Sequence, residues 1–201
     1  MTTPRTGSPL ALTVLALLQH RPLHPYGIQR LIRQWGKDKV VNVGQRTSLY
    51  RTIDRLTAAG LIEVRETERD QAYPERTVYE ITDTGRAVAR EWLLDMLGTP
   101  KQEFPEFPAA LSHLLMLAPE EIREALERRG RTLSEALATL DADISAETGR
   151  GLPRITMLEA EYLRAVTAAE LQWLHSVIDD LRSGNLAWSV TDLLAFAEAP
   201  E

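Results

Sequence analysis

The stretch GQRTSLYRTIDRLTAAGLI, residues 44–62, combines three arginines and several hydroxyl side chains with regularly spaced apolar residues. Leu49, Ile53 and Leu56 recur at the spacing of one helix face. Gly60 lies where it can end that helix in a left-handed conformation. The stretch therefore predicts a helix whose apolar face packs against a core.

The opposite face of this predicted helix is basic and polar. At about 100° per residue it consists of Thr47, Arg51, Arg55 and Ala58. Arginine can donate two hydrogen bonds to guanine or clamp a phosphate, and a hydroxyl can bond either group. Gln45, just before the helix, can pair with adenine. The alternative is a solvated face with an ion pair between Arg51 and Asp54.

Two further helices are predicted before this stretch. The first follows from the apolar run at residues 10–18, with Ser8 as N-cap and Pro9 as the first helical residue. This run is far shorter than the roughly 20 apolar residues of a membrane span, so it predicts a buried helix. The second covers residues 26–33, and a loop is expected at residues 37–43.

After the third helix the sequence period changes to that of a strand. Apolar and charged residues alternate at 62–64, a polar tract covers 66–75, and a β-branched and aromatic run follows at 78–81. Thr82 then has the position of an N-cap for a helix that runs to Leu97. The sequence thus predicts a hairpin with a long polar tip and a fourth helix.

This order of three helices, a hairpin and a helix is that of a winged helix-turn-helix domain. In that fold the third helix enters the DNA major groove, and we expect the hairpin tip to lie along the backbone. Arg65, Arg69 and Arg76 place basic side chains in or beside the hairpin. Both elements that would touch DNA are therefore basic, which favours DNA binding over plain solvation.

A connection with three prolines, residues 99–108, divides the sequence into two predicted domains. Residues 1–98 form the winged helix-turn-helix, and residues 109–201 form a helical domain. The connection also contains Phe104 and Phe107, which predict that it is packed down.

Two long helices and a short one are predicted in the second domain. The long ones begin at Pro119 and Leu158, with a turn at residues 149–153, and the short one covers residues 186–196. Apolar side chains recur on the long helices at spacings of three and four, which favours packing against another helix. The predicted dimerisation residues are Leu126, Leu133, Leu137, Leu140, Leu158, Tyr162, Val166, Trp173 and Val177.

The charge differs between the two halves of the chain. Residues 1–92 hold 14 Lys and Arg against 10 Asp and Glu (+4), whereas residues 93–201 hold 9 against 19 (−10). This asymmetry favours a polyanion-binding front and an acidic back that like charge keeps off DNA. The chain has no cysteine, which excludes disulfides and thiolate metal sites. A cytoplasmic location is expected.

Three strings of the sequence carry a resemblance to a known family. They are VLALL and PLHPYGI within residues 14–28, SLYRTIDRL and GLI within residues 48–62, and RTVYEITDTG at residues 76–85. In this order and spacing they resemble the PadR family of bacterial transcriptional regulators. The resemblance covers residues 10–95, and the acidic remainder is similar to the longer C-terminal domain of one branch of the family.

The resemblance implies a homodimeric winged-helix protein, usually a repressor, whose C-terminal helices dimerise and can answer to a small molecule. By position, Ser48, Tyr50 and Arg51 match the recognition-helix contacts. Tyr26 matches a tyrosine at the start of the second helix, and Arg76 matches the basic residue before the second wing strand.

The sequence departs from the family pattern at four places. Family members often carry glycine at the positions of Pro25 and Thr47, and proline at the position of Arg51. Their wing tip is often Gly-Arg-Pro, where this chain has QAYPE at residues 71–75. These departures bear on which operator sequence the protein recognises more than on how it binds DNA.

The sequence thus predicts a mainly helical protein with a hairpin wing that binds double-stranded DNA as a homodimeric repressor. Two recognition helices would lie roughly 34 Å apart on a pseudo-palindromic operator. The predicted DNA contacts are Tyr26, Gln45, Arg46, Thr47, Ser48, Tyr50, Arg51, Arg55, Arg65, Arg69 and Arg76. The alternative from another class is a protein-interaction module that uses the acidic helical half and keeps the winged domain as a scaffold.

An enzyme or a metal site finds little support in the sequence. The segment at Gly44 lacks the second glycine and the lysine of a phosphate-binding loop, and the four histidines show no metal-ligand spacing. No catalytic residue or cofactor is therefore predicted, and His24 is expected to start a helix or pack. Tyr162 and Trp173 lie at seam positions, where packing is expected. The aromatics available to an effector pocket are Trp35, Trp92, Trp173, Trp188, Phe104 and Phe107.

Overall fold

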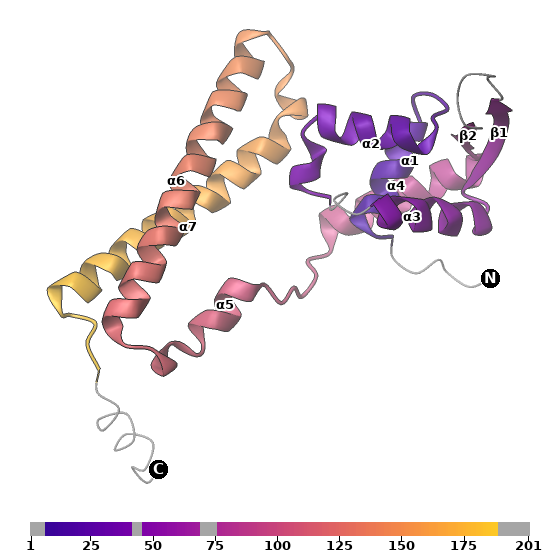
Figure 1. Cartoon of the computed structure of the whole chain (residues 1–201). Coiled ribbons are helices and arrows are strands. Elements are labelled where there is room, and N and C mark those ends of the chain that lie inside the picture. The colour runs from indigo at the N-terminus through magenta and orange to yellow at the C-terminus, as the bar shows by residue number, and fades with distance from the viewer. Residues whose placement is uncertain (1–6, 42–45, 69–75, 189–201) are drawn as a thin grey trace. The chain divides into compact units, whose positions relative to one another are not determined.

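The computed structural model describes residues 7–41, 46–68 and 76–188. The chain divides into two compact units, Met1–Gln102 and Glu103–Glu201. The first contains the hairpin, and the second is built from helices (Figure 1). Over the described part of the chain, no helix combines the length and the apolar composition that crossing a bilayer requires.

The first unit has the element order of a winged helix. Its elements are α1 (Pro9–Leu18), α2 (Pro25–Gln34), the 3-10 helix η1 (Lys37–Lys39), α3 (Arg46–Ala58), β1 (Ile62–Glu68), β2 (Arg76–Ile81) and α4 (Asp83–Gly98). The predicted helices and hairpin are confirmed in this order. The loop predicted at residues 37–43 is wrong at η1, where the chain coils into a 3-10 turn after the left-handed Gly36 (φ 63°).

Local sequence signals start α1 and α4. The Ser8 hydroxyl accepts a hydrogen bond from the Ala11 N–H at 3.2 Å. The Thr82 hydroxyl accepts one from the Gly85 N–H at 3.0 Å. Each cap satisfies a backbone N–H that the first helical turn leaves unpaired, so both predicted N-caps are confirmed.

One hydrophobic core holds the first unit together. Its fully buried side chains include Val14, Leu15, Leu18, Ile28, Ile32, Leu49, Ile53 and Ile62. These residues come from α1, α2, α3 and β1. Burying each large apolar side chain stabilises the fold by about 1.5–3 kcal/mol relative to leaving it exposed. The apolar run at the N-terminus is thus a central core helix, as predicted.

The hairpin is antiparallel and attached to the turn before α2. Val64 lies opposite Tyr79, and a bulge follows between Val64 and Glu66. Leu23 forms an isolated bridge with Tyr79, in which each backbone N–H donates to the other residue's carbonyl at 3.0 Å. The base of the wing is therefore fixed to the helix-turn-helix.

The turn that ends α3 is packed tightly against the start of α4. Gly60 takes the left-handed conformation (φ 68°) that was predicted for it. The Thr82 hydroxyl donates to the Gly60 carbonyl at 2.8 Å. A Cβ on Gly85 would lie 2.0 Å from the Leu61 carbonyl oxygen, so only glycine permits this approach. These contacts set α3 relative to the hairpin.

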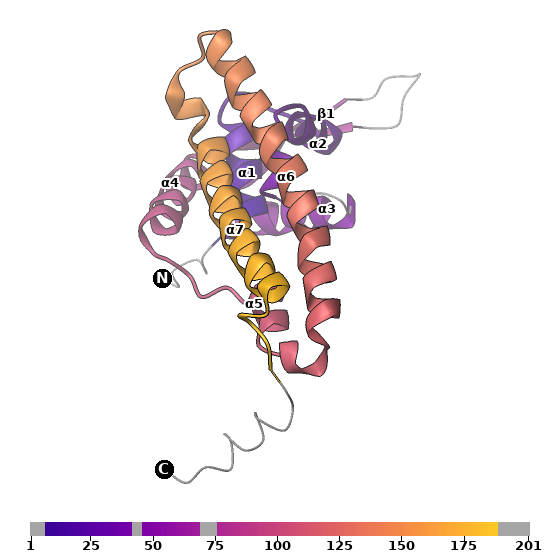
Figure 2. The same cartoon turned by 90° about the vertical axis from the view of Figure 1, so that its left-hand side faces the viewer.

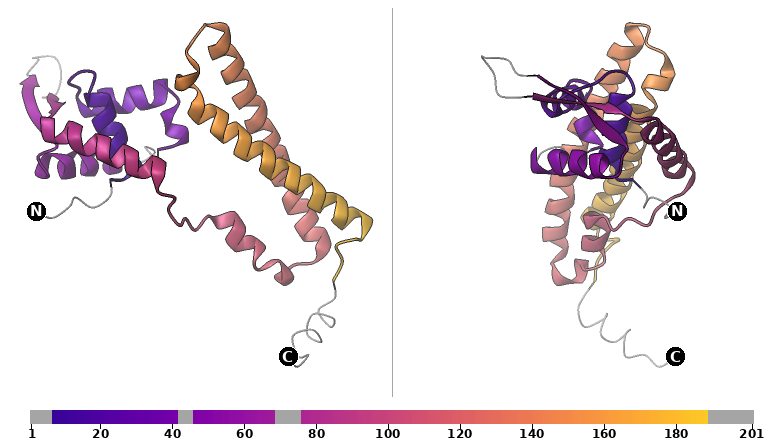
Figure 3. Two further views of the ribbon diagram at one scale, coloured as in Figure 1. Left: turned by 180° about the vertical axis from the view of Figure 1, so that it is seen from behind. Right: turned by 90° about the vertical axis from the view of Figure 1, so that its right-hand side faces the viewer.

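The second unit is dominated by a pair of long helices. Its elements are α5 (Glu106–Leu111), η2 (Leu114–Met116), α6 (Pro119–Gly149), η3 (Arg154–Thr156) and α7 (Leu158–Ser183). Figures 2 and 3 show α6 and α7 side by side, and the two predicted long helices are confirmed. The short helix predicted at 186–196 falls mostly outside the described residues, and residues 186–188 are not helical.

A small core joins α6 to α7. Ile122 and Leu126 of α6 are buried together with Leu174 and Ile178 of α7. Partly buried side chains around them are Phe107, Leu114, Leu133, Val177, Leu181 and Trp188. The expectation that the connection is packed down is thus confirmed for Phe107, which lies in α5. It is wrong for Phe104, which is 90% exposed.

Candidate nucleic-acid interface

The inward face of α3 is confirmed as predicted. Leu49, Ile53 and Leu56 are buried in the core of the first unit. Thr52, on the same side, is also buried, and its hydroxyl donates to the Ser48 carbonyl oxygen at 2.9 Å. Because this face is anchored, the outward side chains of α3 project from a fixed helix.

The outward face of α3 presents two arginines to solvent. Thr47, Arg51, Arg55 and Ala58 are all exposed. Among the described residues neither Arg51 nor Arg55 forms an ion pair, so the alternative pairing of Arg51 with Asp54 is not found there. Two guanidinium groups are therefore left with their donors available to a bound anion or base.

For several predicted DNA contacts the structure describes only the backbone, or does not describe the residue. Gln45 and Arg69 lie outside the described residues. Arg46 begins α3 and Arg76 begins β2, but their side chains are not described. Ser48 is half-buried in the first turn of α3.

The start of α2 carries an exposed aromatic side chain. His24 caps the helix, because its Nδ1 accepts a hydrogen bond from the Gly27 N–H at 2.9 Å. The Tyr26 ring stacks on the His24 ring, with centroids 6.1 Å apart and planes 14° apart. Tyr26 is 61% exposed. The predicted helix-start role of His24 is confirmed, and this stacking orders a tyrosine at the surface.

Tyr50 and Asp54 of α3 lie near Tyr79 of β2. Burial is the largest cause that raises the pKa of Tyr79, and the charge of Asp54 and the proximity of Tyr50 raise it further. Tyr50 itself is about half exposed. Side chains of α3 therefore lie close enough to β2 of the wing to influence the charge of Tyr79.

Arg65 of the wing differs from the arginines of α3. It lies at the bulge of β1, and its guanidinium is 3.7 Å from Glu80 and 4.0 Å from Glu66. Two carboxylates thus compete with any phosphate for this group. Sequence reasoning missed Glu80, because the cross-strand register depends on a bulge that the residue pattern does not reveal.

The nine predicted dimerisation residues divide into two groups. The first is buried or half-buried within the chain and contains Leu126, Leu133, Leu137, Leu140 and Val177. The second is exposed and contains Leu158, Tyr162, Val166 and Trp173, which we call the outer stripe of α7. Tyr162 is 68% exposed, so it does not pack within the chain, and its place in a dimer seam stays a prediction.

The aromatics considered for an effector pocket are divided between the two units. Trp92 is buried in the core of the first unit, whereas Phe107 of α5 meets Trp173 of α7 edge to face, with centroids 6.1 Å apart. The guanidinium carbon of Arg129 lies 3.6 Å from the centre of the Phe107 ring, and Arg129 pairs with Glu170 at 2.5 Å. These contacts fasten α5 to the long helices.

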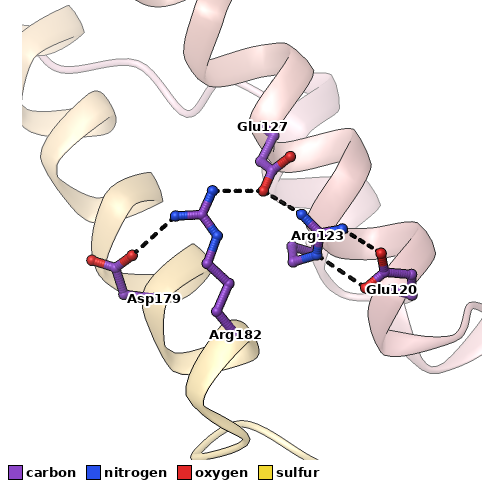
Figure 4. A network of polar contacts seen from close by, with 5 residues as sticks. All are labelled: Glu120, Arg123, Glu127, Asp179 and Arg182. Atoms are coloured by element: carbon purple, nitrogen blue, oxygen red, sulfur yellow. Dashed lines mark hydrogen bonds and ion pairs between the residues drawn. The ribbon is translucent and has the colours of Figure 1, made fainter.

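Ion pairs also join the start of α6 to the end of α7 (Figure 4). Arg182 of α7 lies 2.8 Å from Glu127 and 3.5 Å from Asp179. Arg123 pairs with Glu127 and Glu120 within α6. The hydrogen bond from Arg123 is the largest cause that lowers the pKa of Glu127, and Arg182 adds to it. These charged side chains are therefore paired with one another.

No metal site is found in the part of the chain that the structure describes, since no group of three or more histidines or carboxylates is placed to share an ion there. The described residues offer a basic face on α3, exposed tyrosines at Tyr26 and Tyr50, and a hairpin. Their donors suit phosphates and base edges rather than a chemical reaction.

Comparisons with known proteins agree with this geometry. Residues 14–91 match the sequence model described as "Transcriptional regulator PadR-like family". The comparison with curated proteins gives no match. Among solved structures, Bacillus subtilis PadR in complex with operator DNA is 18% identical with a TM-score of 0.72, over 87% of this chain and 99% of that chain.

Two further structures have the same fold. Bacillus subtilis PadR in complex with p-coumaric acid is 19% identical with a TM-score of 0.67, over 86% of this chain and 98% of that chain. The Vibrio cholerae virulence activator AphA is 20% identical with a TM-score of 0.66, over 87% of this chain and 98% of that chain. At these identities the likeness concerns the fold. Residues 14–91 of the winged-helix domain are thus similar to the PadR-like family of transcriptional regulators, and the chain has the fold of these solved structures.

Proposed function

We propose that this protein is a homodimeric repressor that binds a pseudo-palindromic operator through α3. The outward face of α3 is the observation that supports this most. It holds Arg51 and Arg55 exposed and, among the described residues, without ion pairs, on a helix fixed by its buried face. A basic, rigid and accessible helix next to a wing has the properties that major-groove recognition requires.

Within this proposal the side chains of α3 have different tasks. Arg46, Thr47, Ser48 and Arg51 contact base edges and nearby phosphates, while Tyr50 and Arg55 brace the DNA backbone. Tyr26 contacts the backbone from the start of α2. The wing arginines Arg65, Arg69 and Arg76 follow the adjacent groove. The contact of Arg65 with DNA is weakened by Glu66 and Glu80, which lie within ion-pair distance of its guanidinium.

The dimer forms through the outer stripe of α7. Leu158, Tyr162, Val166 and Trp173 expose apolar surface that α6 does not cover. Such a contiguous apolar surface marks an interface in a soluble protein. Leu126, Leu133 and Val177 of the predicted seam pack between α6 and α7 instead, which leaves the outer stripe for a second copy. In the proposed complex the operator receives the two α3 helices about one DNA turn, roughly 34 Å, apart.

Repression follows most simply from occupancy of a promoter by the dimer. A relative with this fold was crystallised with operator DNA, whereas another is named as a virulence activator, so the sign of regulation is part of the proposal. The DNA partner implies a cytoplasmic location.

A small molecule is proposed to relieve repression. The Bacillus subtilis relative crystallised with p-coumaric acid supports an effector for this fold. A groove of about 540 Å³ between α6 and α7 offers a place for one, with Gly130 and Ile178 among its lining and Arg131, Glu135 and His175 also lining it. Its volume lies in the ordinary range of ligand sites.

The proposal is tested by selecting bound duplexes from a random DNA pool with the full chain. We expect an inverted repeat whose half-sites are separated by about one helical turn. Enrichment of no sequence would contradict the proposal and leave the protein-interaction module, with the winged domain as scaffold, as the better account.

A further inference from the structure

Asp54 lies on the outward face of α3, among the side chains proposed to meet DNA. At about 100° per residue it falls between Tyr50 and Arg51 around the helix axis. It is exposed, as are the residues on either side of it on this face. Arg55 follows it directly in sequence. A carboxylate is thus set into the basic surface of the recognition helix.

The stability of the domain offers no reason for this carboxylate. Within the described ranges, the Asp54 side chain forms neither an ion pair nor a hydrogen bond. Aspartate is unfavourable in the interior of a helix. The helix dipole favours an acidic residue in the first turn, but Asp54 lies beyond that turn. Asp54 acts on Tyr79 of the wing, whose pKa is raised first by burial and then by the charge of Asp54, so this carboxylate does not favour the charged form of Tyr79.

On a DNA-binding face this carboxylate also opposes binding in general. Phosphates repel it, and its charge offsets part of the attraction that Arg51 and Arg55 provide. It favours binding only where a donor on a base meets it. In the major groove, the exocyclic N4 amino group of cytosine is the donor that aspartate and glutamate accept from.

We propose that Asp54 is a specificity-determining residue that accepts a hydrogen bond from the N4 amino group of one cytosine in each operator half-site. This inference rests on the proposed function, because it takes α3 as the recognition helix. A half-site without that cytosine leaves Asp54 desolvated and unpaired beside the DNA. Asp54 therefore discriminates mainly by rejecting wrong sequences, while the arginines supply affinity.

The experiment compares the random-pool selection for the full-length protein with those for Asp54→Ala and Asp54→Asn. Glu63→Gln, which removes an exposed carboxylate from β1, is the control for loss of one negative charge in the same domain. Circular dichroism and a thermal melt check that each variant is folded. The two Asp54 variants differ in hydrogen-bonding ability, so each tests the contact separately.

We expect Asp54→Ala to lower the preference for cytosine at one position per half-site on the order of tenfold or more, and to keep the preferences elsewhere. The affinity of Asp54→Ala for unrelated duplexes rises, because the variant lacks the negative charge that the DNA phosphates repel. Asp54→Asn shifts the same position toward adenine, whose N6 and N7 suit an amide. Glu63→Gln selects the wild-type motif.

Two outcomes separate the inference from the function it rests on. If the wild-type protein selects a motif and Asp54→Ala selects that motif with every preference intact, the role of Asp54 is overturned and α3 remains the recognition helix. If the wild-type protein selects no motif, the proposed function fails and the inference fails with it.

Discussion

In the second unit Arg123, Arg129, Arg154, Arg164 and Arg182 each pair with a carboxylate, whereas Arg51 and Arg55 on α3 pair with none among the described residues. The same side chain thus serves two purposes in one chain. In the second unit these five arginines offset part of the acidic charge, and Arg129, Arg164 and Arg182 join α6 to α7. On α3 the arginine donors remain unsatisfied by the protein, which leaves them for a ligand.

The apolar side chains show the same contrast. Leu174 and Ile178 of α7 are covered by α6, whereas Tyr162 and Trp173 on another side of α7 are exposed. Both proposed interfaces, one for DNA and one for a second copy, thus consist of groups that have no such partner among the described residues.

The largest effect is expected from the double variant Tyr162→Asp and Trp173→Asp. Two charges on the outer stripe of α7 would have to be buried without partners, and each replaced aromatic anchor contributes about 2 kcal/mol or more to association. We expect a monomer at micromolar concentration by sedimentation. The matched change of both residues to Phe should retain the dimer. A dimer in the Asp variant would show that copies pair elsewhere.

Arg51→Ala is expected to weaken operator binding by about 1–3 kcal/mol. The reason is that Arg51 has no partner within the described residues, so its loss removes a DNA contact and leaves the fold unchanged. Arg164→Ala is the matched control, because Arg164 pairs with Asp141 in the second unit. Equal affinities of the two variants in a binding titration would contradict the contrast between the units.

Arg182→Ala is expected to lower the free energy of unfolding by about 1 kcal/mol or less, as is usual for an exposed ion pair. Arg182 joins α7 to Glu127 on α6, so the effect is on the second unit. Chemical denaturation measures it, and operator affinity should be unchanged. A large loss of DNA binding without unfolding would mean that this arginine is not merely structural.

The smallest effect is a pH dependence from Glu127. Its pKa is lowered in the folded chain by hydrogen bonds from Arg123 and then Arg182. A lowered folded-state pKa means that the stabilisation is present above the ordinary glutamate pKa and is lost as the pH falls through the folded value. The difference in unfolding free energy between wild type and Glu127→Gln should therefore shrink on acidification below the ordinary glutamate range. A difference that grows there would reverse the sign of this coupling.

The helical order of the first unit and the inward face of α3 could be predicted from the sequence, because apolar spacing and caps are local signals. The positions of Leu49, Ile53 and Leu56 follow from periodicity alone. The left-handed Gly60 follows from its place after the last apolar residue. Periodicity therefore predicts which side of a helix is apolar.

Periodicity does not tell which partner covers an apolar side. Leu126 and Tyr162 both lay in the predicted seam, yet one is buried within the chain and the other is exposed. The pairing of Arg65 with Glu80 likewise depends on a bulge and a register that arise only when the strands meet. Such contacts join distant parts of the chain, so no local pattern contains them.

The central claim is that the outward face of α3 holds DNA through Arg51 and Arg55. The most direct test measures affinity for a selected operator at increasing salt, for the wild type and for the double variant Arg51→Ala and Arg55→Ala. We predict that log K falls linearly with log salt for the wild type, at about −0.9 per neutralised phosphate, and that the double variant binds more weakly with a slope shallower by about 1–2. An unchanged affinity and slope in the double variant would contradict the claim.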